Sequence, residues 1–151
     1  MLEKTFKAHK VAKGKALGEA LVSHSPISFM GGVNPEIGLV VEKGHELEGV
    51  SIANKVLIFP VGKGSTAGSY QLFELVYFRK APVAIINLRA DPVVAIGAII
   101  GNIPMVDKPE ENLLEVIKTG DLVEVDADHG TVRLLVGNNQ DRAKANNGGS
   151  F

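Results

Sequence analysis

The sequence predicts an α/β fold, in which a parallel sheet flanked by helices is closed by antiparallel strands from the two ends of the chain. Its length of 151 residues matches the usual size of one domain. Strand-like alternation of apolar residues dominates near both ends, whereas helix-like spacing appears in the middle, after two uninterrupted apolar runs. Strands at the ends with a βαβα segment between them are typical of such a mixed sheet in a single compact domain.

The first predicted elements are a strand, a glycine-rich loop and two further strands. Small apolar residues at every second position predict a strand over residues 16–22, with small inward side chains that suit a tight barrel or sandwich. Glycines and an Asn-Pro pair predict a loop over residues 28–38. The apolar residues 39–41 predict a short strand. The run KVLIFP at residues 55–60 predicts a strand that is buried on both faces.

Two helices are predicted in the middle of the chain, each after a buried strand. The first begins at Gly68, and its predicted buried stripe consists of Tyr70, Phe73, Leu75, Val76 and Phe78. The run VAIINL at residues 83–88 predicts the next strand. Asp91 fits the N-cap position and Pro92 the first position of a helix over residues 92–101. Because this helix is apolar nearly all round, we expect it to be covered on several sides.

The remaining elements lie in the last third of the chain. Residues 103–106 predict a short strand, and residues 109–118 predict an amphipathic helix with a proline near its start. Two alternating runs, residues 122–126 and 131–135, predict a hairpin. We expect residues 1–136 to form the domain and residues 137–151, which have no apolar period, to form a flexible tail.

Composition and charge exclude several classes of function. The 16 basic and 17 acidic residues give a net charge of −1. The chain therefore lacks the broad positive field with which proteins bind nucleic acid non-specifically. The chain has no cysteine, which excludes disulfides, Cys-ligated zinc, Cys-ligated iron–sulfur clusters and Cys nucleophiles within it. The uncharged, mostly apolar stretch at residues 92–106 is shorter than the ~20 residues that span a bilayer. We therefore expect a cytoplasmic protein with no nucleic-acid or membrane partner.

The strongest candidate site is the glycine-rich segment VGKGSTAGS, residues 61–69, between a predicted strand and a predicted helix. Such a turn directs backbone N–H groups and the positive end of the helix toward one spot, which suits an anion. Lys63 adds a cation, and Ser65 and Thr66 add hydroxyl groups. In a simpler interpretation, Ser65 or Ser69 only caps the helix and the glycines only turn the chain. The segment taken alone leaves both interpretations open.

The residue spacing of this segment can be compared with that of known phosphate-binding loops. The nucleoside-triphosphate loop fails, because Lys63 precedes Gly64 instead of following it. The dinucleotide fingerprint G-x-G-x-x-[GA] is matched by Gly62, Gly64 and Ala67, and the acid Asp91 follows near the usual spacing of about 20 residues. This match is weak, because Asp91 also fits a helix cap. A phosphohistidine loop is disfavoured, since the segment contains no histidine.

The other candidate site residues also have simple structural explanations. Arg89 follows a buried strand, where ligands of α/β sheets usually bind, but an ion pair with Asp91 explains it as well. Gly31 and Gly32 fit a second active-site loop or a simple turn. Lys63 fits a contact to a substrate carboxylate or phosphate, or a solvated loop lysine. The histidines have no ligand spacing, so no metal site is predicted at His9, His24, His45 or His129.

Several separated motifs together resemble the small subunit of the aconitase X family. They are ISFMGGV at residues 27–33, FPVGKGSTAGSY at 59–70, AIINL at 84–88, IPMVD at 103–107 and GDLVEVD at 120–126. The resemblance runs in the same order over roughly residues 5–136. It implies a swivelling β/β/α domain, like the mobile domain of aconitase, docked on a large catalytic subunit that holds an iron–sulfur cluster or iron. The absence of cysteine agrees with a cluster on the other chain.

The resemblance also implies an activity. Family members of the most similar kind are hydro-lyases that dehydrate (R)-5-phosphomevalonate to trans-anhydromevalonate 5-phosphate in an isoprenoid route, and they work only as complexes. The family's proton acceptor carries over to Ser65, and iron on the partner would hold the leaving hydroxyl group. Substrate contacts are expected from the candidates around Ser65, which are Lys63, Gly64, Thr66, Arg89, Gly31 and Gly32. Related members dehydrate cis-3-hydroxy-L-proline, but Thr66 and Tyr70 favour the phosphorylated substrate.

An alternative of another class is a freestanding phosphate-binding or dinucleotide-binding module that uses the same loop. The two hypotheses differ in what surrounds the loop. A module binds its ligand alone. A swivelling subunit exposes an apolar patch around the loop and stays inactive until a partner covers that patch.

Overall fold

The strand β3 (Lys15–Val22) joins the two halves of one curled sheet. In the computed structural model, which describes residues 3–135, the start of β3 pairs antiparallel with β9 (Leu122–Asp126). The end of β3 pairs parallel with β6 (Val56–Phe59). The full strand order is β1-β10-β9-β3-β6-β7-β8-β2. The predicted parallel sheet closed by antiparallel strands is therefore confirmed, whereas the predicted tail, residues 137–151, lies outside the described residues.

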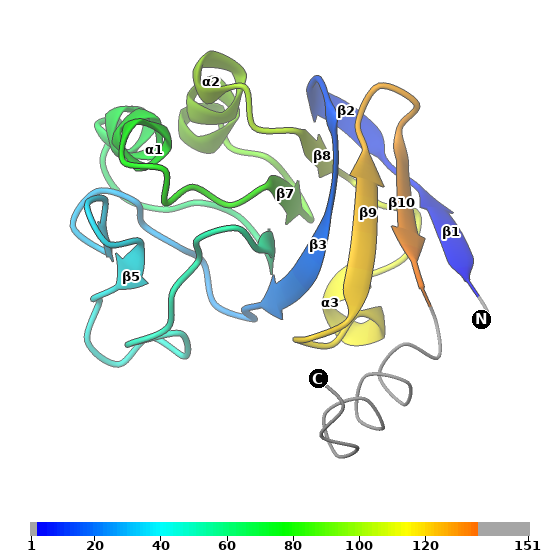
Figure 1. The fold of residues 1–151 in the computed structure, drawn as a ribbon, viewed down its shortest axis with the longest axis horizontal. Coiled ribbons are helices and arrows are strands. Elements are labelled where there is room, and N and C mark those ends of the chain that lie inside the picture. Colours follow the sequence, from blue (N-terminus) through cyan, green and yellow to red (C-terminus); the bar gives the residue numbers. More distant parts are fainter. Residues whose placement is uncertain (1–2, 136–151) are drawn as a thin grey trace, which may run out of the picture.

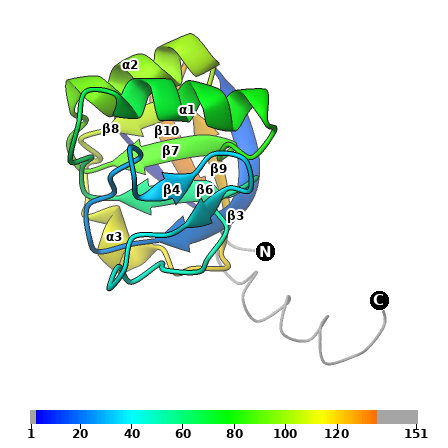
Figure 2. The same cartoon turned by 90° about the vertical axis from the view of Figure 1, so that its left-hand side faces the viewer.

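The parallel half carries two helices on one face. The strands β6, β7 (Ala84–Asn87) and β8 (Met105–Asp107) run parallel to one another. The helices α1 (Gly68–Tyr77) and α2 (Pro92–Gly101) lie side by side over them (Figures 1 and 2). Every residue of β6 and β7 is buried, as their uninterrupted apolar sequences predict. These connections place the loop after β6 and the loop after β7 at the same edge of the sheet.

The antiparallel half contains strands from both ends of the chain. The hairpin of β9 and β10 (Thr131–Leu134) is as predicted. Two strands that the sequence analysis did not assign, β1 (Lys4–Lys7) and β2 (His9–Ala12), occupy the two edges of the sheet and pair with β10 and β8. Only Ala8 separates β1 from β2, so this short connection brings the two edges together (Figure 1).

Two apolar cores fill the molecule, one on each face of the parallel strands. The core beneath α1 and α2 contains Leu57, Phe59, Leu72, Leu75, Ile85, Val94, Ala98 and Met105. The core inside the curl of the sheet contains Phe6, Val56, Ile58, Ile86, Val106, Leu113, Val123, Val125 and Val132. Alternate residues of β6 contribute to the two cores, as a strand covered on both faces requires. The resulting layers are sheet, sheet and helices, which is the expected β/β/α arrangement.

The predicted loop over residues 28–38 contains one short strand. This strand, β4 (Val33–Asn34), pairs antiparallel with β5 (Leu39–Val40), the short strand predicted over residues 39–41. The strand predicted at residues 103–106 begins two residues later, as β8. Within residues 3–135, no helix is long and apolar enough to cross a bilayer.

The helix predicted over residues 109–118 is wrong in its extent. The observed helix α3 (Leu113–Val116) is one turn long, and Asn112 caps it by accepting a hydrogen bond from the Leu114 N–H at 3.0 Å. Glu110, predicted in the first helical turn, instead pairs with β1. Its N–H donates to the Lys7 carbonyl at 2.9 Å, and its carboxylate accepts from the Lys7 N–H at 2.6 Å. This long-range pairing overrides the local helical pattern.

The predicted buried stripe of α1 is wrong for its aromatic residues. The helix buries Gly68, Leu72 and Leu75 against the sheet and α2. Tyr70 is 73% exposed and Phe73 is 46% exposed, and Phe78 is also exposed. The sequence contains two apolar stripes at helical spacing, and the narrower, aliphatic stripe is the one that packs inward. It fits closely against α2, because a Cβ at Gly97 would lie 2.6 Å from Leu72 Cδ1.

The helix α2 begins as predicted but is covered only in part. Asp91 is its N-cap and Pro92 lies in its first turn. Ile96, Ile99 and Ile100 are each about half exposed, although their sequence context is as apolar as that of the buried Val94. The expected cover on several sides is therefore only partial: α2 packs against α1 and β2, and its outer face is exposed.

Candidate active-site loop

The glycine-rich loop leaves the carboxyl end of β6 and enters α1. Gly62 forms a parallel bridge with Ile27, where the Ile27 N–H donates to the Val61 carbonyl at 3.3 Å. The Lys63 N–H then donates to the Ile27 carbonyl at 3.0 Å. Beyond this anchor, residues 63–66 are exposed. The loop therefore presents four consecutive residues to solvent from a firmly hydrogen-bonded base.

Ser65 lies at the N-terminal end of α1, on the exposed part of the loop. Its Oγ accepts a hydrogen bond from the Ala67 N–H at 3.1 Å, and its carbonyl accepts from the Gly68 N–H at 3.0 Å. The N-cap residue is Ala67, and no side chain caps α1. Ser69 donates its hydroxyl to the Val93 carbonyl of α2 at 2.7 Å. Neither serine is the N-cap, so the simple capping interpretation is wrong.

Gly64 requires glycine for two reasons. Its φ of +97° lies in the region that L side chains rarely adopt, and a Cβ there would lie 2.6 Å from the Ser28 Oγ. The close approach brings the loop that contains Gly31 and Gly32 against the loop of Ser65. Gly31 has a φ of +83° with open space around it, whereas a Cβ at Gly32 would overlap the Ser28 carbonyl. The two glycine-rich loops thus form one surface.

Lys63 is bound within this surface by a residue that the sequence analysis missed. Its Nζ lies 2.8 Å from Glu42 Oε2. Glu42 is in turn anchored beside the second loop, because its N–H donates to the Gly32 carbonyl at 3.3 Å. The Lys63 ammonium is therefore paired in this structure. No local signal could have identified Glu42, since the pair joins two separate loops.

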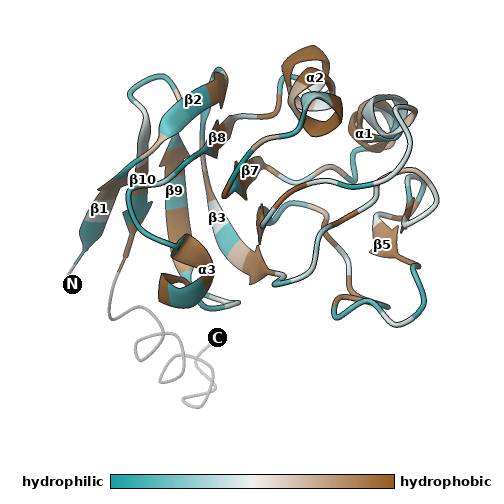
Figure 3. Cartoon of the chain, turned by 180° about the vertical axis from the view of Figure 1, so that it is seen from behind, coloured by the Kyte–Doolittle hydropathy of each residue, from teal (hydrophilic) through white to brown (hydrophobic). Residues whose placement is uncertain are grey.

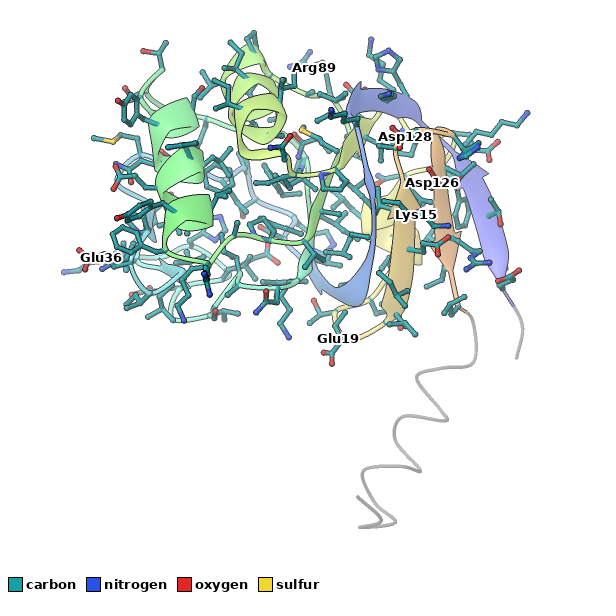
Figure 4. The ribbon with its side chains drawn as sticks, turned by 45° about the horizontal axis from the view of Figure 1, so that its top comes forward. Lys15, Glu19, Glu36, Arg89, Asp126 and Asp128 are labelled. Carbon is teal, nitrogen blue, oxygen red and sulfur yellow. The ribbon has the colours of Figure 1, made fainter. Side chains whose placement is uncertain are left out.

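Arg89 and Asp91 follow β7 at the same edge of the sheet. Arg89 is exposed and lies beside α2 (Figure 4). The ion pair with Asp91 is not formed within the described part of the chain. Instead, Asp91 Oδ1 accepts from the Gly62 N–H at 3.0 Å, and Asp91 Oδ2 accepts from the Val93 N–H at 3.1 Å. Because both oxygens of Asp91 bind backbone amides, the dinucleotide interpretation of this acid has no support in the structure.

An exposed apolar surface adjoins the loop. Ser69, Tyr70, Phe73 and Ile100 line a hollow of about 240 Å³ between the two helices. We name as the α1–α2 face the exposed apolar residues Tyr70, Phe73, Tyr77, Ile96, Ile99 and Ile100. Figure 3 shows hydrophobic colour over most of α2. This is the kind of patch expected around the loop of a swivelling subunit, and it starts five residues after Ser65 in the sequence.

The described residues contain no ligand set for a metal. Among residues 3–135, no three His, Cys, Asp or Glu side chains are grouped so that they could hold an ion. The sequence has no cysteine to ligate an iron–sulfur cluster. The chain therefore does not fit a resident cluster.

Comparisons with known proteins agree with the resemblance found in the sequence. The model of the family described as "Aconitase X swivel domain" matches residues 5–134. A protein of Methanocella arvoryzae named phosphomevalonate dehydratase small subunit is 53% identical over 85% of this chain and 98% of its own length. A protein of the same name from Methanosarcina mazei is 50% identical over 89% of this chain and 94% of its own length.

A solved structure shows the same fold. The crystal structure described as Thermococcus kodakaraensis aconitase X in the holo-form superimposes with a TM-score of 0.83 at 49% sequence identity, over 87% of this chain and 98% of that chain. The family match covers both glycine-rich loops, both long helices and the hairpin. The chain belongs to the aconitase X swivel-domain family.

Proposed function

We propose that this chain is the small subunit of a phosphomevalonate dehydratase, a hydro-lyase that is active only together with a large subunit. Relatives that are 50–53% identical to it, over at least 94% of their own length, carry this name. The observation that carries the chemical role is the position of Ser65: an exposed hydroxyl group at the N-terminal end of α1 that accepts a backbone N–H.

The reaction removes water from (R)-5-phosphomevalonate and gives trans-anhydromevalonate 5-phosphate. A base takes a proton from the carbon next to the carboxylate, the hydroxyl group leaves the adjacent carbon, and a carbon–carbon double bond forms. A proton next to a carboxylate is weakly acidic, so the base must be strong. A serine alkoxide has that strength, but a serine hydroxyl ionises only where negative charge is stabilised.

The surroundings of Ser65 favour its ionised form. The Ala67 N–H already donates to Ser65 Oγ at 3.1 Å, so a negative charge on this oxygen would strengthen an existing hydrogen bond. The positive end of the α1 dipole adds to this effect, and no acidic residue lies in the first turn of α1. In water these effects are small; in a water-excluded interface they become much larger. We therefore infer that Ser65 becomes a competent base only when a partner covers it.

The residues around Ser65 are proposed to bind the anionic substrate. Arg89 is an exposed cation after β7, and Thr66 adds a hydroxyl group beside Ser65. Gly64 lets the two loops approach each other, and Gly31, with open space around it, and Gly32 are proposed to let the backbone of the second loop approach the substrate. Lys63 is held by Glu42, so it contributes a cation whose position is fixed by the second loop. Together these residues provide hydrogen-bond donors and positive charge for carboxylate and phosphate groups.

The large subunit is proposed to bind across the loop and the α1–α2 face. Any chain that completes the active site around Ser65 must approach the start of α1, where Tyr70 and Phe73 are exposed beside the hollow. Exposed apolar patches mark interaction sites. An iron–sulfur cluster or iron, which the family resemblance implies, would be held by that partner, since the sequence has no cysteine and residues 3–135 hold no group of metal ligands.

The proposal is tested with the complex. This chain and the large subunit of the same host are co-expressed, purified without oxygen and assayed with (R)-5-phosphomevalonate, with cis-3-hydroxy-L-proline as the competing substrate. We expect a stable complex that dehydrates phosphomevalonate, and no turnover by this chain alone. Turnover of hydroxyproline only would overturn the substrate. Nucleotide binding by the isolated chain, without a partner, would overturn the class of function.

A further inference from the structure

We propose that Asp91 is a positioning residue for Ser65, which holds the catalytic loop against the start of α2. This inference rests on the proposed function, in which Ser65 is the base. Asp91 lies between β7 and α2, and its carboxylate accepts hydrogen bonds from Gly62 and α2, not from the exposed residues 63–66. It therefore acts through the backbone of the loop and not on the substrate itself.

The two oxygens of the Asp91 carboxylate serve two different elements. Oδ2 accepts from the N–H groups of Val93 and Val94 at 3.1 and 3.3 Å, which is the ordinary task of an N-cap. Oδ1 accepts from the Gly62 N–H at 3.0 Å, in the loop after β6. A serine, threonine or asparagine would cap α2 about as well, but each has a single side-chain acceptor oxygen. The carboxylate is the group that can bind both elements at once.

Gly62 fits tightly against this carboxylate. A Cβ at Gly62 would lie 2.5 Å from Asp91 Oδ1 and 2.5 Å from Val94 Cγ2. The loop backbone is thus in direct contact with both the cap and the first turn of α2. Three residues later the same backbone carries Ser65, and residues 63–66 are exposed. The contacts of Gly62, together with the Lys63 to Ile27 hydrogen bond, fix the base of the exposed segment.

Asp91 is itself held in place from the neighbouring strand. The residue before it, Ala90, donates its N–H to Asp107 Oδ2 at 2.8 Å. Asp107 is the last residue of β8 and is 4% exposed, and its other oxygen lies 2.8 Å from His9 Nδ1. Two carboxylates therefore connect the carboxyl ends of β8, β7 and β6 in sequence. The position of the Ser65 loop is set by the edge of the whole parallel sheet.

The experiment uses the variant Asp91→Asn in the purified complex. Its amide oxygen can still cap α2, but its NH₂ group would face the Gly62 N–H, donor against donor. We expect kcat to fall about 10- to 100-fold with KM within about threefold of wild type, because small displacements of a catalytic group cost rate more than binding. Amide hydrogen exchange across residues 61–68 should become faster.

Two further variants make the result decisive. Asp91→Ser keeps a cap on α2 but cannot reach Gly62, and it should behave like Asp91→Asn. Asn112→Ala removes the N-cap of α3 and is the matched control; it should lower Tm while kcat and the exchange of residues 61–68 stay unchanged. Wild-type kcat in both Asp91 variants, or a kcat loss in Asn112→Ala of the same size, would overturn the positioning role.

The outcomes also separate this inference from the proposed function. If the wild-type complex fails to dehydrate phosphomevalonate, the proposed function is wrong, and hydrogen exchange still decides the structural role of Asp91. If the complex is active and exchange of residues 61–68 is unaltered by Asp91→Asn, the proposed function stands and the positioning inference is wrong.

Discussion

The hairpin end and the loop end of the molecule expose different kinds of side chain to solvent. The hairpin end consists of β9, β10 and the turn between them, and its exposed charges are paired within the chain. Lys10 lies 3.2 Å from Asp128, and Arg133 lies 3.2 Å from Glu124. The loop end consists of the two glycine-rich loops and the α1–α2 face, where aromatic and aliphatic side chains are exposed. Register places the hairpin turn at the start of β3 and the loop that follows β6 at its end.

The carboxyl groups of the hairpin turn are also hydrogen-bonded within the chain. Desolvation raises the pKa of Asp126, but hydrogen bonds from the backbone and ring of His129 outweigh it, so the pKa lies below its ordinary value. The hydrogen bond from Lys10 is the main cause that lowers the pKa of Asp128. Figure 4 shows Lys15, Asp126 and Asp128 gathered at this end, with Arg89 apart from them beside α2.

The difference in exposed apolar side chains indicates which surface another chain would cover. Charged side chains have partners within the chain at the hairpin end and also at the loop end, where Lys63 pairs with Glu42, so ion pairs alone do not distinguish the two ends. Apolar side chains left exposed at helical spacing, beside a loop of hydrogen-bond donors, mark a surface that gains stability when another chain covers it. The α1–α2 face is therefore the surface on which the proposed large subunit is expected to bind.

The largest expected effect comes from Ser65→Ala at the loop end. Loss of a general base typically costs 10² to 10⁴ in rate, so kcat of the complex should fall about a thousandfold. Assembly should be intact, because the Ser65 side chain makes one hydrogen bond, to Ala67. Thr5→Ala removes an exposed hydroxyl from β1 and is the matched control at the other end. Near-normal turnover of Ser65→Ala in the assembled complex would remove Ser65 from the mechanism.

The next effect concerns assembly and uses a matched pair of exposed apolar residues. Phe73 on α1 is 46% exposed and Leu17 on β3 is 53% exposed. A charge at Phe73 would be buried against the large subunit, so Phe73→Glu should raise the dissociation constant of the complex about 100-fold. Leu17→Glu should leave it unchanged. Titration of labelled small subunit against large subunit measures both, and equal weakening by the two variants would erase the distinction between the two ends.

The sequence predicted the parts of the fold that depend on local pattern. β6 and β7 were found because their apolar runs are continuous, and Asp91 was found because an acid before a proline is a helix start. β1 was missed, since an edge strand rich in lysine has a single buried residue, Phe6, to reveal it. The length of α3 was overestimated, because the pairing of Glu110 with Lys7 is invisible in a local window.

The residues of the candidate loop could be predicted from the sequence, whereas the hydrogen bonds and ion pairs that hold it could not. Glycines, hydroxyl groups and a lysine in one short segment identify the Ser65 loop. The bonds that shape it join residues far apart in sequence: Lys63 to Glu42, and Gly62 to Asp91. The prediction of the buried face of α1 was wrong for a related reason. Two apolar stripes share that helix, and only the close fit at Gly97 decides that Leu72 faces inward.

A smaller effect compares two glycines that are packed against oxygen atoms. A Cβ at Gly62 would lie 2.5 Å from Asp91 Oδ1, and a Cβ at Gly130 would lie 2.7 Å from the Ala8 carbonyl. Both alanine variants should lose roughly 1–3 kcal/mol of unfolding free energy. Gly62→Ala should also lower kcat about tenfold, because it displaces the loop, whereas Gly130→Ala should not. Denaturant titration and steady-state kinetics separate the two, and equal kcat values would contradict a specific role for the loop end.

The smallest effect is at the hairpin turn. The Asp128 carboxylate accepts hydrogen bonds from Lys10 and, at 3.2 Å, from the Gly14 N–H, and its pKa is lowered from the ordinary value of 3.8. A lowered folded pKa means that its stabilising contribution is present above pH 3.8 and disappears as pH falls through the folded pKa. Asp128→Asn should therefore lower Tm by no more than about 2 °C at pH 7, and the difference from wild type should shrink as the pH falls below 3.8. Thermal unfolding from pH 7 to pH 2.5 measures this. Added salt should shrink the difference at pH 7, since exposed pairs are screened, while turnover of the complex stays the same. A loss of turnover in Asp128→Asn would show that the hairpin end takes part in the function.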